Sequence, residues 1–326
     1  MRVLVTGGAG FIGARFADRL LEAGEYVVVL DKLTYAGTEA NVPDGAEFHR
    51  GDVAVRSDVE AVGRVDAIVN FAAETHVDRS ILGPQDFART DVLGALVLAE
   101  VAVAANIRLV QVSTDEVYGD VGAPVDEAAP LRPSSPYSAS KAGGDLQVLA
   151  AARTFGANAC VTRGSNTYGP RQFPEKLIPL FTTNALDGEP LPLYGDGGQV
   201  RDWLHVDDHC SGVELVLREG RRGEVYNLGA GEERTNVEVA RRILELTGAD
   251  ESLLRQVDDR PGHDRRYSLD ATRARALGWS PQRPFDEGLD ETVRWYRDNR
   301  AWWEPLKSQS YRTYYEQQYG ARLSGK

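Results

Sequence analysis

The chain has 326 residues, of which 42% are hydrophobic and 26% are charged, as is usual for a folded globular protein. Its formal net charge of -12 disfavours binding to nucleic acid, because that affinity depends on Lys and Arg side chains that neutralise phosphates. Cys160 and Cys210 are far apart and form no CxxC motif, so we expect two buried thiols, no disulfide framework and no metal site. The opening "MRVLVTGG" is too short for a membrane span or a secretory signal, and we expect a cytoplasmic protein.

Short runs rich in β-branched residues alternate with helical patterns along the first half of the chain. These runs predict strands at residues 2–7, 25–31, 46–52, 66–73, 108–114 and 159–165. The helical pattern at residues 11–24 ends at Gly24, a residue suited to the position just past a helix. Strands that alternate with helices indicate a parallel sheet, so we predict an α/β fold with a doubly wound, Rossmann-type sheet.

The alternation of strand patterns and helix patterns becomes irregular after Ser165. Residues 165–200 are rich in Pro and Gly, and after residue 227 short helical patterns are interrupted by turn signals. Residues 201–220 resemble a strand and a helix that return to the first domain. We therefore predict two domains. Residues 1–164 and 199–226 form a dinucleotide-binding Rossmann domain, and residues 165–198 and 227–326 form a smaller, mostly helical domain that binds the substrate.

The stretch "TGGAGFIG" follows the first predicted strand and contains Gly7, Gly10 and Gly13 in a GxxGxxG spacing. Glycines allow a tight turn and let backbone amides approach a pyrophosphate at the start of the following helix. A plain tight turn is the alternative interpretation. Asp31 ends the second strand, where a carboxylate accepts hydrogen bonds from a ribose and repels the extra phosphate of NADP. The combination predicts NAD as the cofactor.

The stretch "YSASK" at residues 137–141 follows Ser135-Pro136, which is a helix start signal. Tyr137 and Lys141 are four residues apart, so they share one face of a helix. A cation beside a tyrosine, together with a bound nicotinamide cation, lowers the pKa of the phenol. The pair therefore predicts a tyrosine that acts as a base near neutral pH.

Two adjacent acids, Asp115 and Glu116, come directly after the predicted strand that ends at Thr114. The carboxyl ends of strands in doubly wound sheets open toward the ligand, so these acids are either catalytic or solvated loop residues. Neighbouring strand residues face opposite sides of a sheet. Both acids can serve one substrate only if the backbone turns after Thr114, and we expect that turn.

These motifs resemble the extended short-chain dehydrogenase/reductase family, and within it the dTDP-glucose 4,6-dehydratases. The similarity extends over nearly the whole chain, through "VTGGAGFIG", "FAAETHVDRSI", "VSTDEVYG", "SPYSASKAGGD", "YGPRQFPEKLIPLF", "LYGDGGQVRDWLHVDDH" and "WWEPLKSQSYRTYYEQQYG". The related hexose 4-epimerases lack the acid pair. The resemblance therefore implies NAD-dependent conversion of dTDP-glucose to dTDP-4-keto-6-deoxyglucose, with a nucleotide-sugar-binding second domain.

The resemblance also implies roles for individual residues. Tyr137 would remove the O4 proton with help from Thr114, while Lys141 holds the cofactor ribose. Glu116 would remove the C5 proton, and protonated Asp115 would help the C6 hydroxyl leave. The expected cofactor-binding residues are Gly7, Gly10, Phe11, Ile12, Gly13, Asp31, Lys32, Thr34, Asp52, Val53, Ala72, Ala73, Tyr137 and Lys141. The expected substrate-binding residues are Thr75, His76, Asn166, Lys176, Leu177, Tyr194, Arg201, Asn236, Arg260 and His263.

Some of these assignments have alternatives. We expect Arg201 to bind the diphosphate, because its planar fork suits bidentate phosphate contacts. Lys176 could equally lie on a solvated face, and His263 could equally belong to a structural turn. His76 and Arg79, in "ETHVDRS", either line the sugar pocket or pack behind it. Asp52 and Val53, in "GDV", contact adenine or simply form a turn.

Three positions depart from the pattern of the related dehydratases. Gly164 stands where a cysteine is frequent, and Thr167 and Asp91 stand where asparagines are usual. A threonine replaces only some hydrogen bonds of an amide, so another sugar nucleotide or another dehydration position remains open. Asp91 is also compatible with a purely structural replacement.

Other functions remain open at this point. A nucleotide-sugar 4-epimerase or decarboxylase would share the fold, but the acid pair argues against both. A dinucleotide-sensing protein, or an interaction protein on an inactive fold, would not need Thr114, Tyr137 and Lys141 together. Residues 85–105 and 137–156 carry apolar positions on more than one face, so we expect a homodimer through these helices.

Overall fold

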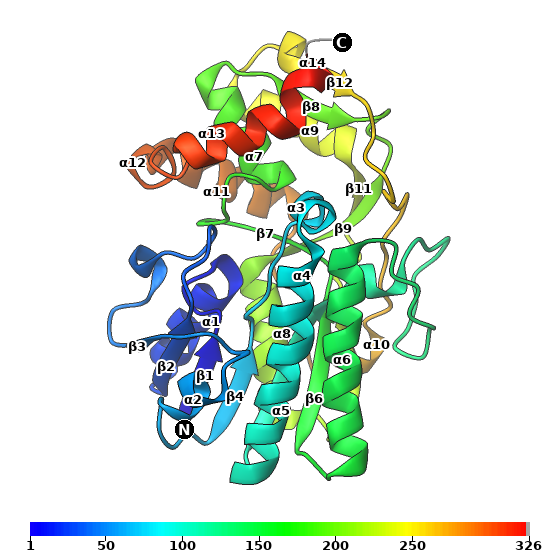
Figure 1. Cartoon of the computed structure of the whole chain (residues 1–326). Helices are drawn as coiled ribbons and strands as arrows, with labels where there is room; N and C mark the ends of the chain where they lie inside the picture. Colours follow the sequence, from blue (N-terminus) through cyan, green and yellow to red (C-terminus); the bar gives the residue numbers. More distant parts are fainter. Residues whose placement is uncertain (324–326) are drawn as a thin grey trace.

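The computed structural model describes residues 1–323, apart from the side chains of residues 309, 310 and 321. In Figure 1 a large sheet covered by helices forms the lower part of the molecule. A smaller group of helices and short strands lies above it and includes the carboxyl-terminal helices. In that upper part, segments from the middle and the end of the chain lie together.

The large sheet consists of seven parallel strands in the order β10-β6-β5-β4-β1-β2-β3. They are β1 (Arg2–Thr6), β2 (Tyr26–Asp31), β3 (Glu47–Arg50), β4 (Ala67–Asn70), β5 (Arg108–Thr114), β6 (Ala159–Gly164) and β10 (Val225–Leu228). The connections reverse direction between β1 and β4, and ligands bind at such a switch point. The predicted strands and the Rossmann-type α/β fold are confirmed.

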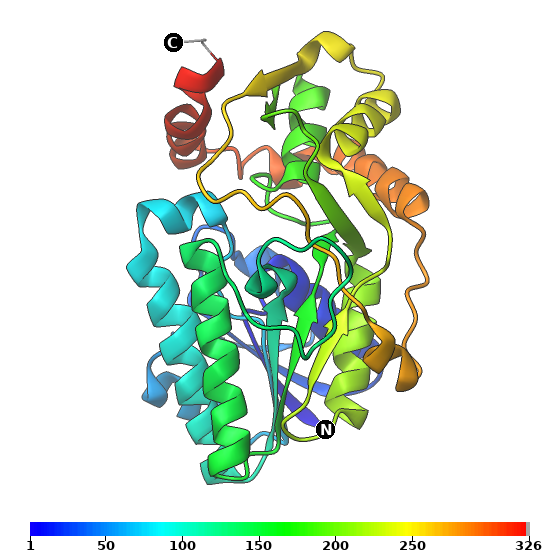
Figure 2. The same ribbon diagram turned by 90° about the vertical axis from the view of Figure 1, so that its right-hand side faces the viewer.

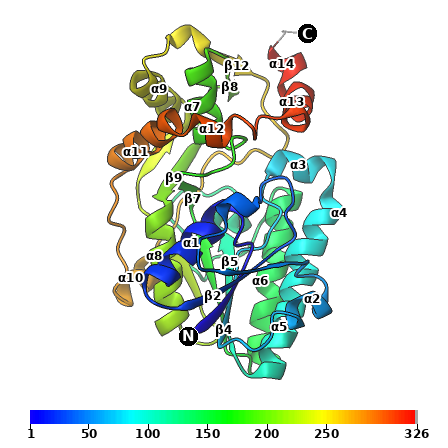
Figure 3. The same ribbon diagram turned by 90° about the vertical axis from the view of Figure 1, so that its left-hand side faces the viewer.

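Helices cover both faces of this sheet (Figure 3). One face carries α1 (Phe11–Glu22) and α8 (Val206–Glu219), and the other carries α2 (Arg56–Glu60), α5 (Gly94–Ala105) and α6 (Pro136–Thr154). The strand β1 shows how the sequence produces this arrangement. Val3 and Val5 pack in the core beneath α1 and α8, whereas Leu4 packs beneath α5 and α6. Successive strand residues face opposite sides, so an unbroken apolar strand fills both cores.

The upper part contains a three-stranded sheet in the order β11-β9-β7 and a two-stranded sheet of β12 and β8 (Figure 2). Their strands are β7 (Asn166–Tyr168), β8 (Leu191–Tyr194), β9 (Val200–His205), β11 (Glu233–Thr235) and β12 (Leu254–Val257). The helices here are α7 (Leu177–Asp187), α9 (Asn236–Thr247), α11 (Phe285–Asp298), α12 (Arg300–Trp303), α13 (Gln309–Tyr315) and α14 (Ala321–Leu323). Ile178, Ile243 and Leu289 are buried in one shared core, which packs α7, α9 and α11 together.

The remaining elements are short. They are the helices α3 (Val77–Leu82), α4 (Pro84–Phe87) and α10 (Thr272–Ala276), the π-helical η2 (Ala88–Leu93) and η5 (Glu316–Gly320), and the 3₁₀ helices η1 (Glu39–Asn41), η3 (Asp115–Tyr118) and η4 (Glu251–Leu253). Among them, α3, η2, η3 and η5 carry residues that line the cavities described below.

The predicted domain division needs corrections. The strand predicted to return to the first domain is β9, and it pairs with β7 and β11 in the small sheet. Its Leu204 nevertheless belongs to the core of the large sheet, together with residues of α8, which follows it. The strand β10 runs across the predicted boundary at residue 226, and Ala271, Ala274 and Trp279 join the core of the large sheet. A local pattern shows that a strand exists but not its partner. We propose that all of β10 and residues 271–279 belong to the first domain.

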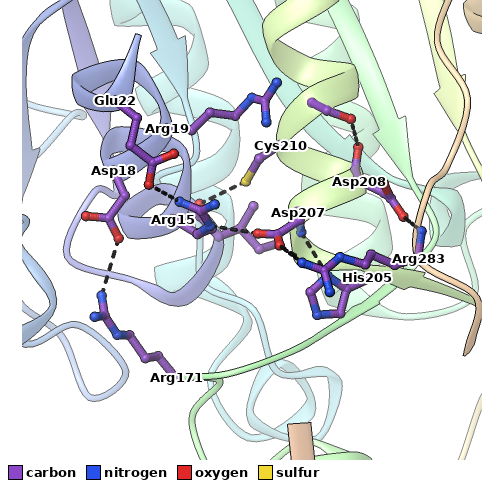
Figure 4. A network of polar contacts seen from close by, with 12 residues as sticks. Arg15, Asp18, Arg19, Glu22, Arg171, His205, Asp207, Asp208, Cys210 and Arg283 are labelled. Atoms are coloured by element: carbon purple, nitrogen blue, oxygen red, sulfur yellow. Dashed lines mark hydrogen bonds and ion pairs between the residues drawn. The ribbon is translucent and has the colours of Figure 1, made fainter. Parts of the chain in front are cut away.

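Ion pairs on the α1 side tie the two parts together (Figure 4). Arg15 Nε lies 2.7 Å from Asp207 Oδ1, and Asp207 Oδ2 lies 3.4 Å from Arg283 Nη2. The backbone N–H groups of Gln282 and Arg283 donate to the Asp208 carboxylate at 2.8 and 2.9 Å. Because this segment leads directly into α11, the network fixes the upper helices relative to the large sheet.

The two cysteines are buried and unpaired, as predicted. Cys160 lies on β6 and Cys210 on α8, and both belong to the core beneath α1. Within residues 1–323, no helix has both the length and the apolar character that crossing a membrane requires.

Candidate active site

A cavity of about 290 Å³ lies where β1, β4 and β5 end. It is lined by every predicted cofactor-binding residue except Asp52, namely Gly7, Gly10, Phe11, Ile12, Gly13, Asp31, Lys32, Thr34, Val53, Ala72, Ala73, Tyr137 and Lys141. Asp52 instead accepts the N–H of Ala54 at 2.8 Å and approaches Arg89 at 3.4 Å. These contacts match the alternative in which Asp52 is a turn residue.

The glycine turn leaves no room for side chains at two of its positions. Gly7 has a φ of 70°, and a Cβ there would lie 2.6 Å from the backbone nitrogen of Ala72. A Cβ on Gly13 would lie 2.3 Å from the carbonyl oxygen of Gly7. Gly10 precedes α1 without a side-chain cap, so the first N–H groups of the helix face the cavity unscreened. The turn therefore fits the pyrophosphate of a dinucleotide.

Asp31 is held in place by the backbone. Its carboxylate accepts the N–H of Leu33 at 2.8 Å and that of Ala9 at 3.1 Å. Each carboxylate oxygen has two lone pairs, so both retain an acceptor position for a ribose hydroxyl. The adjacent Lys32 is already paired with Glu74 at 3.0 Å. This end of the cavity therefore suits a ribose diol better than a 2′-phosphate.

The strand β5 ends at Thr114, and η3 begins at the next residue, so the backbone turns where the sequence required it. Asp115 and Glu116 both line the cavity. Thr114 Oγ1 donates to Asp115 Oδ1 at 3.1 Å, while Asp115 Oδ2 is buried without a hydrogen-bond partner within residues 1–323. Burial and the nearby Glu116 raise the pKa of Asp115 well above its usual value. Both influences favour the protonated form of Asp115.

Glu116 has a different electrostatic environment. Burial raises its pKa, but three cations oppose that shift: Arg260, Lys176 and Arg201. Separate environments of this kind give two neighbouring carboxyl groups different protonation states. The pair can thus supply one proton donor and one proton acceptor.

The helix α6 begins where the sequence predicted. Pro136 is its first residue, and the Ser135 side chain accepts the N–H of Ser138, which forms a capping box. The first turns of α6 bring Tyr137 and Lys141 to the cavity. Lys141 Nζ donates to the carbonyl oxygen of Val112, on β5, at 2.8 Å.

The protein groups around Tyr137 act on its pKa in both directions. Burial raises this pKa well above its usual value, and the nearby carboxyl groups of Glu116 and Asp91 raise it further. The hydrogen bond with Thr114 acts in the opposite direction. The predicted lowering of the pKa depends on the positive charge of a bound nicotinamide, which is not among these groups, so it stays a prediction.

Asp91 adds a titratable group beside the catalytic lysine. It lies in η2 with 1% of its surface exposed, and it accepts a hydrogen bond from Ser140 Oγ at 2.6 Å. Its Oδ1 atom is buried without a partner. Burial raises the pKa of Asp91 to about 7, and the charge of Lys141 opposes the shift. Asp91 therefore differs from an asparagine in charge as well as in shape.

A second cavity, of about 130 Å³, adjoins the first. It is lined by the predicted substrate residues His76, Asn166, Lys176, Leu177, Tyr194, Arg201, Asn236, Arg260 and His263, whereas Thr75 lines the first cavity. Both cavities share Glu116, Asn166, Glu175, Lys176, Leu177 and Trp203. Glu116 therefore lies at the junction of the two cavities.

Two arginines offer positive charge to the second cavity. Arg201 is 4% exposed, its guanidinium lies 4.1 Å from the ring centre of Tyr267, and its Nη2 donates to the carbonyl of Asp264 at 2.9 Å. These contacts already use part of the hydrogen-bonding capacity of the Arg201 guanidinium group. Arg260 pairs with Asp78 at 3.1 Å and has a buried Nε without a partner. Arg260 is therefore as well placed as Arg201 to bind an anionic group.

His76 and Arg79 make packing contacts. The His76 ring lies between the hydroxyl of Tyr314, at 3.2 Å, and the carbonyl of Glu175, at 3.4 Å. The Arg79 guanidinium lies 3.9 and 4.1 Å from the ring centres of Tyr35 and Tyr314, and its Nε pairs with Glu175 at 2.9 Å. Both side chains hold the carboxyl-terminal helices against the loop after β4.

Lys176 and His263 both line the second cavity. Lys176 Nζ donates to the carbonyl of Thr75 and lies 5.9 Å from the ring centre of Tyr137. His263 Nδ1 lies 2.6 Å from Asp259 Oδ1, and burial lowers the pKa of His263 to about 4. His263 therefore supports a turn and lines the second cavity at the same time.

Several lining residues were missed by the sequence analysis. They are Tyr35, Glu175, Trp203 and His209 in the first cavity, and Asp78, Tyr267 and Tyr319 in the second. Glu175 and Asp78 lie next to or near predicted residues, so proximity to "PEK" and "THVD" was a usable signal. The tyrosines come from distant segments, and only the fold brings them to the site.

A dinucleotide-shaped cavity at the switch point of a parallel sheet, with Tyr137 and Lys141 on one helix turn, defines an extended short-chain dehydrogenase/reductase. The chain matches the family model described as GDP-mannose 4,6 dehydratase over residues 4–292, and it belongs to that family.

Relatives within the family differ in their similarity to the chain. A dTDP-glucose 4,6-dehydratase of Streptomyces niveus is 54% identical over 323 residues, which cover 94% of this chain and 96% of the relative. The dTDP-glucose 4,6-dehydratase DesIV of Streptomyces venezuelae, solved with NAD bound, has a TM-score of 0.91 and 53% identity, covering 94% of this chain and 100% of its own. A UDP-glucose 4-epimerase of Thermus thermophilus, solved with NAD, has a TM-score of 0.88 but 35% identity, covering 92% and 100%. Sequence identity to this chain is clearly higher for the two dehydratases than for the epimerase, whereas the TM-scores of the two solved structures are nearly equal.

Proposed function

We propose that this protein is an NAD-dependent dehydratase that converts dTDP-glucose to dTDP-4-keto-6-deoxyglucose with loss of one water. The observation that carries the proposal is the acid pair Asp115 and Glu116, which lies in one cavity with Tyr137 and has two electrostatic environments. Relatives about half identical to the chain bear the name of this activity.

Bound NAD supplies the oxidation of C4 and the later reduction of C6, so that no external oxidant is consumed. The glycine turn would hold its pyrophosphate, Asp31 its adenosine ribose and Lys141 its nicotinamide ribose. All of these residues line the first cavity. The reacting sugar would then lie at the junction, between the cofactor and the nucleotide half of the substrate.

The first proton transfer belongs to Tyr137. The ionised phenol oxygen of Tyr137 takes the proton from O4, and Thr114 is hydrogen-bonded to that oxygen. Because burial and two acids keep the pKa of Tyr137 high, the phenol becomes a base only when positive charge is bound beside it. Proton removal is thereby restricted to the loaded enzyme.

The acid pair then carries the dehydration. A ketone at C4 acidifies the C5 hydrogen, and the Glu116 carboxylate takes this proton. Asp115 gives its proton to the C6 hydroxyl, which leaves as water while the C5–C6 double bond forms. The orphaned Oδ2 of Asp115 is the oxygen that carries the transferable proton. Glu116 returns its proton to C5 when C6 is reduced, which restores its carboxylate. Tyr137 has gained the O4 proton and Asp115 has lost one to the departing water, so transfer of a proton from Tyr137 to Asp115, for which Thr114 lies hydrogen-bonded to both, resets the two groups for the next turnover.

The test is a product assay. The purified protein is incubated with dTDP-glucose, UDP-glucose and GDP-mannose, and the sugar nucleotides are weighed by mass spectrometry. We expect loss of one water, with the highest kcat/KM for dTDP-glucose. An epimerase would leave the mass unchanged, and a decarboxylase would release carbon dioxide. If no substrate loses water, the proposal is wrong; if another nucleotide is preferred, only the substrate assignment is wrong.

We propose that the protein forms a homodimer through α5 and α6. Leu93 and Leu146 are 39% and 56% exposed, and Ala139, Gly143 and Ala150 extend the stripe of Leu146 along the outer face of α6. A spacing of three and four residues places them on one side of the helix. Leu146→Glu should convert the dimer to a monomer in light scattering. A monomeric unmodified protein would contradict this assembly.

We propose the cytoplasm as the compartment of the enzyme. Two unpaired, buried cysteines are consistent with a reducing environment, where disulfides are rare.

The partners we propose are the nucleotide sugar and a second copy of the chain. A net charge of -12 gives no support for a nucleic-acid partner.

A further inference from the structure

His209, on α8, lines the first cavity and lies beside Gly164, which pairs with Thr114 in the large sheet. Only 2% of its surface is exposed, and its Nε2 atom is buried without a hydrogen-bond partner among residues 1–323. Buried polar atoms are nearly always paired, so an unpaired one needs an explanation. Neither the expected site nor the proposed mechanism uses this histidine.

Gly164, at the end of β6, is what admits the imidazole. A Cβ at this position would lie 2.6 Å from Cε1 and 2.7 Å from Nε2 of His209. Any other residue here, including the cysteine that is frequent in the related dehydratases, would push the ring away. The departure at position 164 therefore has a physical counterpart on α8.

Thr167 determines which nitrogen of the ring carries the proton. Its hydroxyl donates to the carbonyl of Ser165 at 3.1 Å and lies 2.7 Å from His209 Nδ1. A hydroxyl has one hydrogen, and when that hydrogen is on the Ser165 carbonyl the hydroxyl accepts from Nδ1 of the neutral ring. Burial lowers the pKa of His209 to about 4, which keeps the ring neutral. Nε2 is therefore left with a lone pair and no proton.

We propose that His209 is a cofactor-positioning residue whose Nε2 accepts a hydrogen bond from the carboxamide N–H of the nicotinamide. The inference rests on the proposed function, because it requires NAD in the first cavity. An acceptor at the catalytic end needs an N–H or O–H donor, and the carboxamide is the N–H donor on the nicotinamide ring. Gly164, Thr167 and His209 act together: the first makes room, the second fixes the tautomer and the third makes the contact.

The experiment compares three ligands on the cofactor-free protein by calorimetry. The ligands are NAD, its analogue with a carboxylate in place of the carboxamide, and ADP-ribose, which has no nicotinamide. The analogue lacks the N–H and places a charged oxygen against a lone pair. We expect wild type to bind NAD roughly tenfold more tightly than the analogue, which is the upper range for one hydrogen bond. His209→Phe should reduce that ratio to near one and leave ADP-ribose binding unchanged.

The outcomes separate this inference from the proposed function. An unchanged ratio in folded His209→Phe overturns the inference, whereas failure of ADP-ribose and NAD to bind wild type contradicts the proposed function. Thr167→Val is the second variant. It keeps the imidazole ring of His209 but removes the hydroxyl that fixes the ring proton on Nδ1. We expect an intermediate ratio for it. If His209→Phe does not fold, a wild-type ratio in Thr167→Val overturns the inference instead. Thermal melting followed by circular dichroism monitors the fold of both variants.

Discussion

The two cavities of this enzyme are built in different ways. The cofactor cavity uses residues that follow directly after strands of one sheet, such as Gly7 after β1 and Asp31 at the end of β2. The nucleotide cavity takes residues from positions as far apart as His76 and Tyr319. A parallel sheet places its strand ends together automatically, whereas the second cavity exists only after several distant segments have packed.

The two cavities also differ in charge, and the difference affects the chemistry. The cations Lys176, Arg201 and Arg260 oppose the rise in the pKa of Glu116. An anionic diphosphate bound to these cations would screen them, and the pKa of Glu116 would then rise. A carboxylate with a higher pKa is a better base near neutral pH. We therefore infer that binding of a diphosphate in the second cavity would raise the pKa of Glu116 at its border with the first.

Arg201→Lys should have the largest effect of the variants that distinguish the cavities. Lysine keeps the charge but loses the fork, so we expect KM for dTDP-glucose to rise about ten- to a hundredfold. NAD affinity should not change, because Arg201 does not line the cofactor cavity. The matched control is Arg265→Lys, which changes an exposed arginine paired with Asp196. An equal loss of NAD affinity in Arg201→Lys would show that the cavities are not separate.

Asp31→Asn should have a smaller effect, confined to the cofactor cavity. The wild-type carboxylate repels a 2′-phosphate, so we expect NAD to bind at least tenfold more tightly than NADP. The amide removes the charge, and the two affinities should approach each other. Calorimetry with both dinucleotides measures the ratio, and KM for dTDP-glucose serves as the control. Wild-type protein that binds NADP as well as NAD would contradict the role of Asp31.

Asp91→Asn should have the smallest effect on catalysis and a visible effect on stability. Asp91 remains protonated in the folded protein up to about pH 7, whereas in the unfolded chain it ionises above 3.8. The folded state binds the extra proton, so the contribution of Asp91 to stability falls as pH rises through this window. An asparagine at position 91 does not ionise, so Asp91→Asn removes this pH-dependent loss of stability. Its gain in Tm should therefore be larger at about pH 8 than at about pH 5.

Thermal melting at several pH values provides the measurement for Asp91. Because each kcal/mol corresponds to roughly 2 °C in a protein of this size, a gain of several degrees is expected. Asp44→Asn changes an exposed aspartate and is the control. A gain in Tm that does not depend on pH would show that shape, rather than charge, distinguishes Asp91 from an asparagine.

The cofactor half could be predicted from sequence because its signals are local. The glycine spacing, the acid at the end of β2 and the Tyr137–Lys141 turn each depend on residues that are close together in the chain. The turn after Thr114 was required by the chemistry, and η3 supplies it. The parallel sheet then followed from alternating strands and helices, whereas the order of its strands came from the structure.

The other features of the fold and the site depend on contacts between residues that are far apart in the sequence, and local sequence patterns do not predict such contacts. The strand β9 was recognised, but its partners β7 and β11 lie far away in sequence. The burial of Tyr137 and the approach of Asp91, which both raise the pKa of the phenol, were not visible in the sequence. Gly164 and Thr167 were noticed as departures, but their common partner His209 is more than forty residues away.

The central claim is that Asp115 and Glu116 carry the dehydration while Tyr137 serves the preceding oxidation. Glu116→Gln tests it most directly, because the amide keeps the size of the side chain and removes the base. Mixed with dTDP-glucose in a single turnover, this variant should accumulate the near-ultraviolet absorbance of reduced nicotinamide, since loss of a positioned base costs on the order of a hundred- to ten-thousandfold in rate. Tyr137→Phe, in contrast, should show no such absorbance. Near-normal turnover by Glu116→Gln, or a folded variant that never reduces its cofactor, would contradict the account.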